Sequence, residues 1–153
     1  MPNHSQRLSY FDSSVLIKRY VDEPESKFVD KIWVDDSNKI ATSSLSYAEI
    51  FAAFYRLYRE GVLSLKNLKL ILIEFEQDWK GLVIIDFTSE VRDIVPQLIK
   101  KISLKGADLV QMACVAFLNA RSVPVILYTT DARMKTAAQD LSIPLQDLPN
   151  CHT

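Results

Sequence analysis

The chain has 153 residues, of which 48% are hydrophobic and 24% charged, a composition typical of a single globular domain. No apolar run approaches the roughly 20 residues that cross a bilayer, and no apolar segment follows the N-terminus as in a secretory signal, so we expect a cytoplasmic protein. The formal net charge of -1 gives no overall attraction for nucleic acid, so any such binding needs a local basic patch.

Short apolar runs alternate with amphipathic segments along the chain. The apolar runs predict strands over residues 8–11, 39–42, 82–87, 125–129 and 143–145. The amphipathic segments predict helices over 14–21, 25–34, 43–61, 65–79, 88–102 with a kink or break at Pro96, 106–121 and 131–141. Strands separated by helices indicate a parallel sheet covered on both faces. The sequence thus predicts a three-layer α/β domain over 8–148, with a flexible extension at 1–7 and a tail at 149–153.

The histidines and cysteines exclude several kinds of catalytic site. His4 and His152 lie near the chain ends, so a nucleophilic serine or cysteine would have no internal base. The two cysteines, Cys114 and Cys151, lack the spacing of metal ligands. If the protein catalyses a reaction, carboxylates must therefore carry the chemistry.

Four acids are flanked on both sides by apolar or small residues. Asp12 follows the first predicted strand and Asp131 the fourth, while Glu49 and Asp108 are placed in the first turns of their predicted helices. Because helices begin where parallel strands end, we expect all four carboxylates at the same edge of the sheet. Each acid taken alone could instead be an N-cap or a partner of the helix dipole.

Four carboxylates at one place are more informative than one. Each pair repels by roughly 4 kcal/mol at 4 Å and an effective dielectric of 20, and a fold tolerates this when a cation lies between them. Oxygen ligands suit Mg²⁺ or Mn²⁺ rather than zinc. Such sites activate water and stabilise charge on a phosphoryl oxygen, as in nucleases and phosphatases. Ser13, Thr129 and Thr130 are candidates to hydrogen-bond a carboxylate or a metal-bound water, or are plain caps.

The segments YFDSSVLIKRYVDEPES, SSLSYAEIFAAF, KGADLVQMACVAF and LYTTDARMKTAA resemble, in this order, the four signature blocks of the PIN-domain ribonucleases. The likeness is greatest to VapC-type toxins of prokaryotic toxin-antitoxin pairs and runs from about residue 8 to 148. It implies a PIN-like fold in which Asp12, Glu49, Asp108 and Asp131 are the catalytic, metal-binding acids. It also implies Mg²⁺- or Mn²⁺-dependent endonucleolytic cleavage of RNA by metal-activated water, a homodimer, and inhibition by an antitoxin whose C-terminal segment fills the groove.

The third block departs from the family pattern. It reads Gly106-Ala107-Asp108-Leu109, where the family commonly has a basic residue and an Asp-Ala step. The acid is retained, and we expect the entry into its helix to differ.

RNA requires positive charge near its phosphates. We expect Lys105, before Asp108, or Arg133, after Asp131, to contact the substrate; basic residues on helices are otherwise often solvated surface. Further candidates are Lys18, Arg19, Lys100, Lys101 and Lys135. The helices around 47–58 and 65–79 are more apolar than one buried face requires, which predicts an antitoxin groove or a dimer contact.

Other functions remain open at this point. A catalytically silent PIN-like module could keep the fold and bind RNA or protein. A phosphoryl-transfer receiver or phosphatase is less consistent, because those folds need paired acids near the first strand and Ser13-Ser14 follow Asp12. A nucleotide-binding oxidoreductase is disfavoured because the three glycines do not form a GxGxxG motif.

Overall fold

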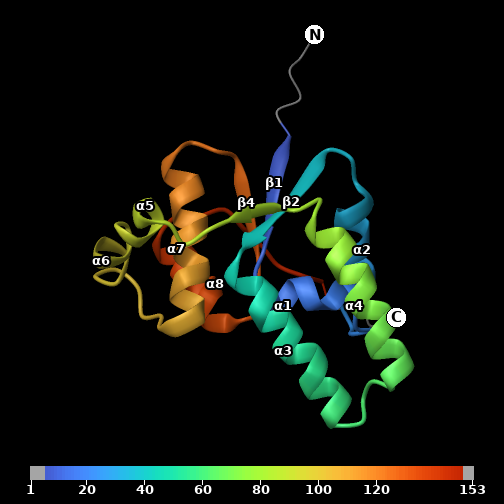
Figure 1. The fold of residues 1–153 in the computed structure, drawn as a ribbon. Helices are drawn as coiled ribbons and strands as arrows, with labels where there is room; N and C mark the ends of the chain where they lie inside the picture. The colour runs from blue at the N-terminus through green and yellow to red at the C-terminus, as the bar shows by residue number, and fades with distance from the viewer. Residues whose placement is uncertain (1–5, 150–153) are drawn as a thin grey trace.

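The central sheet has β1 in the middle. In the computed structural model, which describes residues 6–149, five strands pair in the order β3-β2-β1-β4-β5 (Figure 1). The strands are β1 (Arg7–Phe11), β2 (Asn38–Ser43), β3 (Val83–Ile85), β4 (Val125–Tyr128) and β5 (Leu145–Gln146). Every neighbouring pair is parallel, which confirms the predicted sheet type. The chain order reverses on the two sides of β1, so β1 and β4 meet at the point where open α/β sheets bind ligands.

Helices cover both faces of this sheet, as predicted. On one face lie α1 (Ser13–Leu16), the 3-10 helix η1 (Ile17–Arg19), α2 (Ser26–Val34), α3 (Leu45–Arg59) and α4 (Leu65–Trp79). On the other lie α5 (Ser89–Arg92), α6 (Val95–Leu98), α7 (Gly106–Ala120) and α8 (Ala132–Asp140) (Figure 1). Successive strand residues point to opposite faces, so Tyr10 packs in the α5–α8 core and Phe11 in the α1–α4 core. The three-layer prediction is confirmed.

The helix predicted over 14–21 is wrong in length. The α-helical part ends at Leu16, and the chain continues as the 3-10 turn of η1, where the Tyr20 amide donates to the Ile17 carbonyl. This tighter turn carries Lys18 inward, where it pairs with Glu23 and Glu25. The change from α-helix to 3-10 turn and the burial of Lys18 occur together at the end of this segment.

The helix predicted over 88–102 is two short helices. Thr88 caps α5 as expected, accepting a hydrogen bond from the Val91 amide. The helix then ends at Arg92, four residues before Pro96, which lies in the first turn of α6. Proline lacks an amide proton and its ring clashes with the carbonyl four residues earlier, so the predicted break at Pro96 separates the two segments.

The pair formed by α3 and α4 projects away from the sheet (Figure 1). Gly61, which has φ +76°, ends α3, and the next amide, that of Val62, donates to the Leu57 carbonyl. Several apolar side chains of this pair and its loop are exposed: Tyr55, Tyr58, Val62, Leu65, Leu70 and Ile73. We call these six residues the hairpin patch. They agree with the predicted excess of apolar surface.

Near the chain ends the structure describes residues from Gln6 to Pro149. Arg7 begins β1 and pairs with Asn38, so the sheet starts one residue earlier than the predicted domain. The remainder of the predicted extension and tail, including His4, Cys151 and His152, lies outside the described residues, apart from Gln6 and Pro149. Within residues 6–149 no helix is both long and apolar enough to cross a membrane.

Candidate functional site

Asp12 follows β1 directly and is the N-cap of α1. Its Oδ1 accepts hydrogen bonds from the Ser14 hydroxyl at 2.5 Å and from the Val15 amide at 3.2 Å, and its Oδ2 accepts one from the Thr129 hydroxyl. The side chain is only 4% exposed. Asp12 is therefore both an N-cap and a buried carboxylate, so these two interpretations of the sequence do not exclude each other.

The pKa of Asp12 is raised from its ordinary value to about 6. Burial is the main cause, since a carboxylate loses hydration inside the protein. The hydrogen bonds from Ser14, Thr129 and Val15 oppose this effect, while the negative charge of Asp108 adds to it. A buried carboxylate whose charged form is disfavoured, and whose pKa is therefore perturbed, is a candidate functional group.

Thr129 joins the end of β4 to the end of β1. Besides donating to Asp12, its fully buried hydroxyl oxygen accepts a hydrogen bond from the Asp131 amide at 3.1 Å. The Thr130 amide donates to Ser14 Oγ at 3.3 Å. Of the predicted supporting residues, Thr129 therefore hydrogen-bonds Asp12 itself, and Thr130 hydrogen-bonds Ser14, which in turn donates to Asp12. In the described residues Ser14, and not the predicted Ser13, is the serine that hydrogen-bonds Asp12.

Asp131 is the N-cap of α8. Its Oδ1 accepts hydrogen bonds from the amides of Arg133 at 2.8 Å and Met134 at 3.0 Å. The side chain is partly exposed. Because Oδ1 takes both cap bonds, the other carboxylate oxygen faces no cap amide and is available to a ligand.

Asp108 lies in the first turn of α7, as predicted. Gly106 begins this helix with φ +55°, a left-handed conformation that favours glycine, which explains the unusual helix entry expected from the sequence. The pKa of Asp108 is raised, first by burial and then by the nearby charge of Asp131, while Arg133 acts in the opposite direction. The charge of Asp131 therefore acts on Asp108, and the charge of Asp108 acts on Asp12.

Glu49 does not lie in the first turn of its helix, so this part of the prediction is wrong. The helix α3 begins at Leu45, which makes Glu49 its fifth residue, and no acid occupies the first turn. The serines before Leu45 belong to the end of β2 and to the N-cap, so the helix starts later than its sequence pattern indicates. Glu49 still faces the α7 side of the site, because its Oε1 accepts a hydrogen bond from Gln111 at 2.9 Å.

Gln111 is a site residue that the sequence reasoning missed. It is buried on α7, three residues after Asp108. Its amide also donates to Ser46 Oγ at 2.8 Å and accepts from the Tyr10 hydroxyl at 2.6 Å. The available signal was a single glutamine within the mainly apolar stretch after Asp108, at the spacing that shares a face with that acid.

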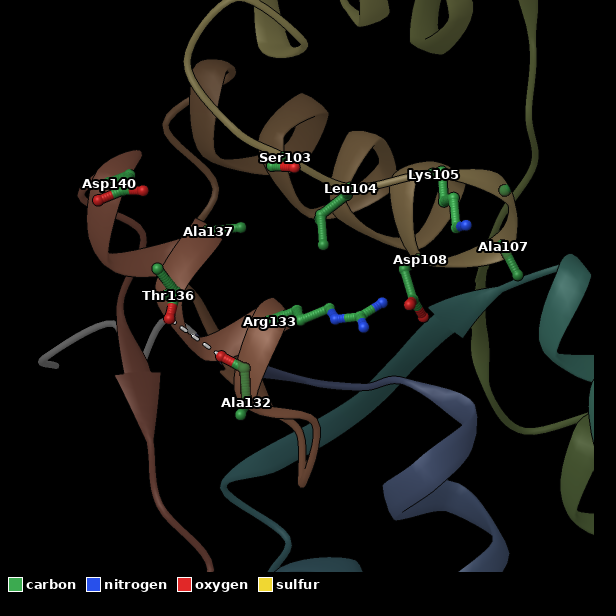
Figure 2. A pocket seen from close by; sticks show the side chains of 11 residues that line it. Ser103, Leu104, Lys105, Ala107, Asp108, Ala132, Arg133, Thr136, Ala137 and Asp140 are labelled. Carbon is green, nitrogen blue, oxygen red and sulfur yellow. Dashed lines mark hydrogen bonds between the residues drawn. The ribbon is translucent and has the colours of Figure 1, made fainter.

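A cavity of about 940 Å³ opens beside Asp108, between α8 and the segment that enters α7. Figure 2 shows Arg133 of α8 extending across it toward Asp108, while Asp140 lies at the other end of the cavity. Lys105 lines the same cavity. In the described part of the chain, neither Lys105 nor Arg133 makes an ion pair. Both positive charges therefore lie in the cavity that Asp108 lines, and neither is neutralised by an ion pair among the described residues.

Three other basic candidates have partners within the protein. Lys18 is buried against Glu23 and Glu25. Arg19 pairs with Asp30, Glu74 and Asp78 and stacks over the Trp33 ring. Lys135 pairs with Asp147 at 3.0 Å. The expectation that these residues contact RNA is therefore less well supported than it is for Lys105 and Arg133.

The donor chemistry fits a hard divalent cation. Every candidate ligand is a carboxylate. Burial is the main cause of the raised pKa values of Asp12 and Asp108, and the charges of Asp108 on Asp12 and of Asp131 on Asp108 add a repulsion that a cation would relieve. No three acidic, histidine or cysteine side chains among the described residues already converge as a set that could hold a metal. The type of donor, rather than a preformed set of ligands, is therefore what fits Mg²⁺, a hard cation that proteins bind through carboxylate oxygens together with water and substrate phosphates.

A family model described as "PIN domain" matches residues 9–139. Similar solved structures include VapBC2 from Rickettsia felis bound to promoter DNA, at 17% identity and a TM-score of 0.65 over 93% of this chain and 99% of that chain. FitAcB from Neisseria gonorrhoeae matches at 15% identity and a TM-score of 0.60, over 95% and 99% of the two chains. A toxin-antitoxin complex from Klebsiella pneumoniae matches at 18% identity and a TM-score of 0.54, over 82% and 88%. None of the curated proteins matches.

Proposed function

Because this chain belongs to the PIN domain family, we propose that it is a metal-dependent endoribonuclease, the toxin of a toxin-antitoxin pair in the cytoplasm. One observation carries the proposal: acids from four separate elements lie at the carboxyl edge of the sheet, and one of them, Asp108, lines a cavity together with Lys105 and Arg133. A structural cap or ion pair would need only one or two of these groups. Their combination suits the hydrolysis of a phosphodiester.

In this proposal Asp12, Glu49, Asp108 and Asp131 hold Mg²⁺ or Mn²⁺. Such an ion supplies a nucleophilic water at neutral pH and offsets charge on the phosphoryl oxygens. The protein's own contribution is to hold the carboxylates in place. Thr129 does this for Asp12, and the first amides of α8 do it for Asp131.

Lys105 and Arg133 are the proposed RNA contacts. Both line the cavity beside Asp108, so a phosphate drawn to either of them would lie near the acids. Figure 2 shows that Arg133 reaches toward Asp108 from the opposite wall of the cavity. The substrate backbone is thus attracted to a site that would otherwise repel it.

The hairpin patch is the proposed partner surface. α3, α4 and the loop between them carry six exposed apolar side chains, whereas a charged or polar surface would be usual for a solvated helical pair. Among the similar structures, the one from Klebsiella pneumoniae is described as a toxin-antitoxin complex. By analogy, we propose that a cognate antitoxin or a second copy of this chain covers the patch, the latter giving a homodimer.

A catalytically silent PIN-like binding module is the second candidate. One observation favours it: the described acids do not already form a three-ligand set. Such a module would keep the fold, Lys105 and Arg133, and could bind RNA without cutting it. The two functions differ in metal binding and in catalysis.

Cleavage of a mixed pool of structured RNAs by the purified protein tests the nuclease. The protein is assayed with Mn²⁺, Mg²⁺ or EDTA beside the variants Asp12→Asn and Asp131→Asn. Both acids are N-caps, and asparagine caps a helix as well as aspartate does, so each substitution removes charge while keeping the cap. Asp140→Asn is the matched control, because Asp140 lines the same cavity at its other end.

We expect metal-dependent cutting by the wild type and by Asp140→Asn, and loss of cutting in the two cap variants. In EDTA, which removes the metal, none of the proteins should cut RNA. A folded wild type that binds Mn²⁺ and is free of antitoxin, yet cuts none of the RNAs, would contradict the nuclease and favour the silent module.

A further inference from the structure

Gln111 lies at the centre of a buried polar chain that joins β1, α3 and α7. Its side chain is 2% exposed and makes three hydrogen bonds. The amide nitrogen donates to Glu49 Oε1 and to Ser46 Oγ, at 2.9 and 2.8 Å, and the amide oxygen accepts from the Tyr10 hydroxyl at 2.6 Å. Both N–H groups and the carbonyl oxygen are therefore used.

The direction of these hydrogen bonds follows from their neighbours. The Thr42 hydroxyl donates to the Phe11 carbonyl at 2.7 Å, which uses its only proton. In the 2.7 Å contact between the Thr42 and Ser46 hydroxyls, Ser46 must then donate. The Ser46 oxygen is left to accept from Gln111, so the NH₂ end of the amide faces Ser46.

The acid imposes the same orientation on the amide. An ionised carboxylate only accepts hydrogen bonds, so Glu49 requires the NH₂ end. A flipped Gln111 would turn its oxygen toward the Glu49 oxygen, and two acceptors would face each other. At the other end the Tyr10 hydroxyl has a proton to donate. Gln111 therefore has one orientation that satisfies every contact.

We propose that Gln111 is a positioning residue that orients the Glu49 carboxylate toward a divalent cation. This inference rests on the proposed function. Glutamate has three rotatable side-chain bonds, and Glu49 is only partly buried, so packing alone does not hold it. Gln111 occupies Oε1, while Oε2 makes no hydrogen bond among the described residues and is left for the ion.

The same helix also carries Asp108, one turn before Gln111. A shift of α7 would thus move a proposed ligand and the residue that orients a second ligand together. Residues that hydrogen-bond metal-ligating side chains typically change metal affinity by 10–100-fold when they are replaced. We expect the affinity for Mn²⁺ to fall by about tenfold in Gln111→Met, which keeps the side-chain length and removes both donors.

Titration calorimetry with Mn²⁺ alone, in the absence of RNA, tests the inference. The variants are Gln111→Met, Glu49→Gln and the double substitution, together with Val115→Ala. Val115 is fully buried on the same helix and touches none of the acids by hydrogen bond, so its truncation controls for general destabilisation of α7. Thermal melting checks that each variant is folded.

We expect Gln111→Met to weaken Mn²⁺ binding and Val115→Ala to leave it unchanged. In the Glu49→Gln background the further change at Gln111 should have no effect, because the residue acts through Glu49. Gln111→Leu is the alternative if Gln111→Met does not fold. It removes both donors without adding a charge or a metal ligand beside Glu49, so the same weakening is expected.

The result that overturns the inference is wild-type Mn²⁺ affinity in the folded Gln111 variant, or an equal loss with and without Glu49. Wild-type protein that binds no Mn²⁺ would overturn the proposed function and the role of Gln111 with it. Strong Mn²⁺ binding without RNA cleavage would contradict only the nuclease. Failure of the inference and failure of the proposed function are thus distinguished.

Discussion

The hydroxyl of Thr129 donates a hydrogen bond to the carboxylate of Asp12, although the two residues are 117 positions apart in the chain. They meet because β1 and β4 are adjacent and parallel, with Phe11 paired to Tyr128 at their ends. Through this contact, the residue that follows β4 holds in place the carboxylate that follows β1. It links the sheet topology directly to the candidate site.

Replacing Thr129 by valine should destabilise the protein. Valine keeps the shape but removes the donor to Asp12 and the acceptor for the Asp131 amide. Leaving such buried groups unpaired costs about 1–3 kcal/mol in the free energy of unfolding, measured by urea denaturation. Thr129→Ser, which keeps the hydroxyl, is the control and should lose less. Equal stability of wild type and Thr129→Val would show that this contact does not support the site.

The stability of the metal-free protein should fall as pH rises through the titration of Asp12. The pKa is 3.8 in an ordinary environment and about 6 in the fold. Between these values the folded state binds a proton that the unfolded state has lost, so the unfolding free energy decreases with pH. The expected loss relative to Asp12→Asn is about 2.5 kcal/mol between pH 4 and pH 7.5, at 1.36 kcal/mol per pKa unit.

Urea denaturation of both proteins in EDTA, at several pH values, measures this difference. Asparagine does not titrate, so the other carboxylates of the protein cancel in the comparison. A difference between the two proteins that stays constant from pH 4 to pH 7.5 would show that Asp12 has no raised pKa.

Charge reversal at Arg133 should weaken RNA binding. The binding is measured in the Asp12→Asn background so that the RNA stays intact. Arg133→Glu removes a proposed phosphate contact beside Asp108. The slope of log K against log salt concentration, for binding to single-stranded RNA, should therefore become shallower by at least about 0.7. Lys31→Glu, an exposed residue of α2 on the opposite layer, changes net charge equally and should have little effect. If Arg133→Glu leaves RNA affinity unchanged in this background, and leaves cleavage unchanged when it is the only substitution, Arg133 does not contact the substrate.

A charge placed in the hairpin patch should disrupt the proposed assembly without unfolding the protein. Ile73 is 58% exposed, so Ile73→Glu should change the unfolding free energy by only about 0.5 kcal/mol. Light scattering after size-exclusion chromatography should show a dimer for the wild type and a monomer for this variant. Val34→Glu is the control, since Val34 is 75% exposed on α2, outside the patch. A dimer that survives Ile73→Glu would place the contact elsewhere.

Local sequence patterns determined much of this protein. The alternation of apolar runs with amphipathic segments predicted the parallel sheet and its two helical layers, because periodicity reflects which face a residue buries. Acids directly after strands, Asp12 and Asp131, were placed correctly because a strand end and a helix cap are neighbours in the chain. Gly61 and Pro96 marked helix boundaries through backbone constraints that act within a few residues.

Only the tertiary structure decided the contacts between distant segments. Strand order brought Thr129 to Asp12, and the packing of α7 against α3 brought Gln111 to Glu49. Lys18 is buried against Glu23 and Glu25, which come later in the chain, so it is a weaker candidate for an RNA contact than its sequence position indicates. These contacts depend on how whole elements pack, so no local pattern encodes them. The residue types at the site could therefore be read from the chain, whereas their partners, their burial and their pKa values arise only when the sheet and its layers assemble.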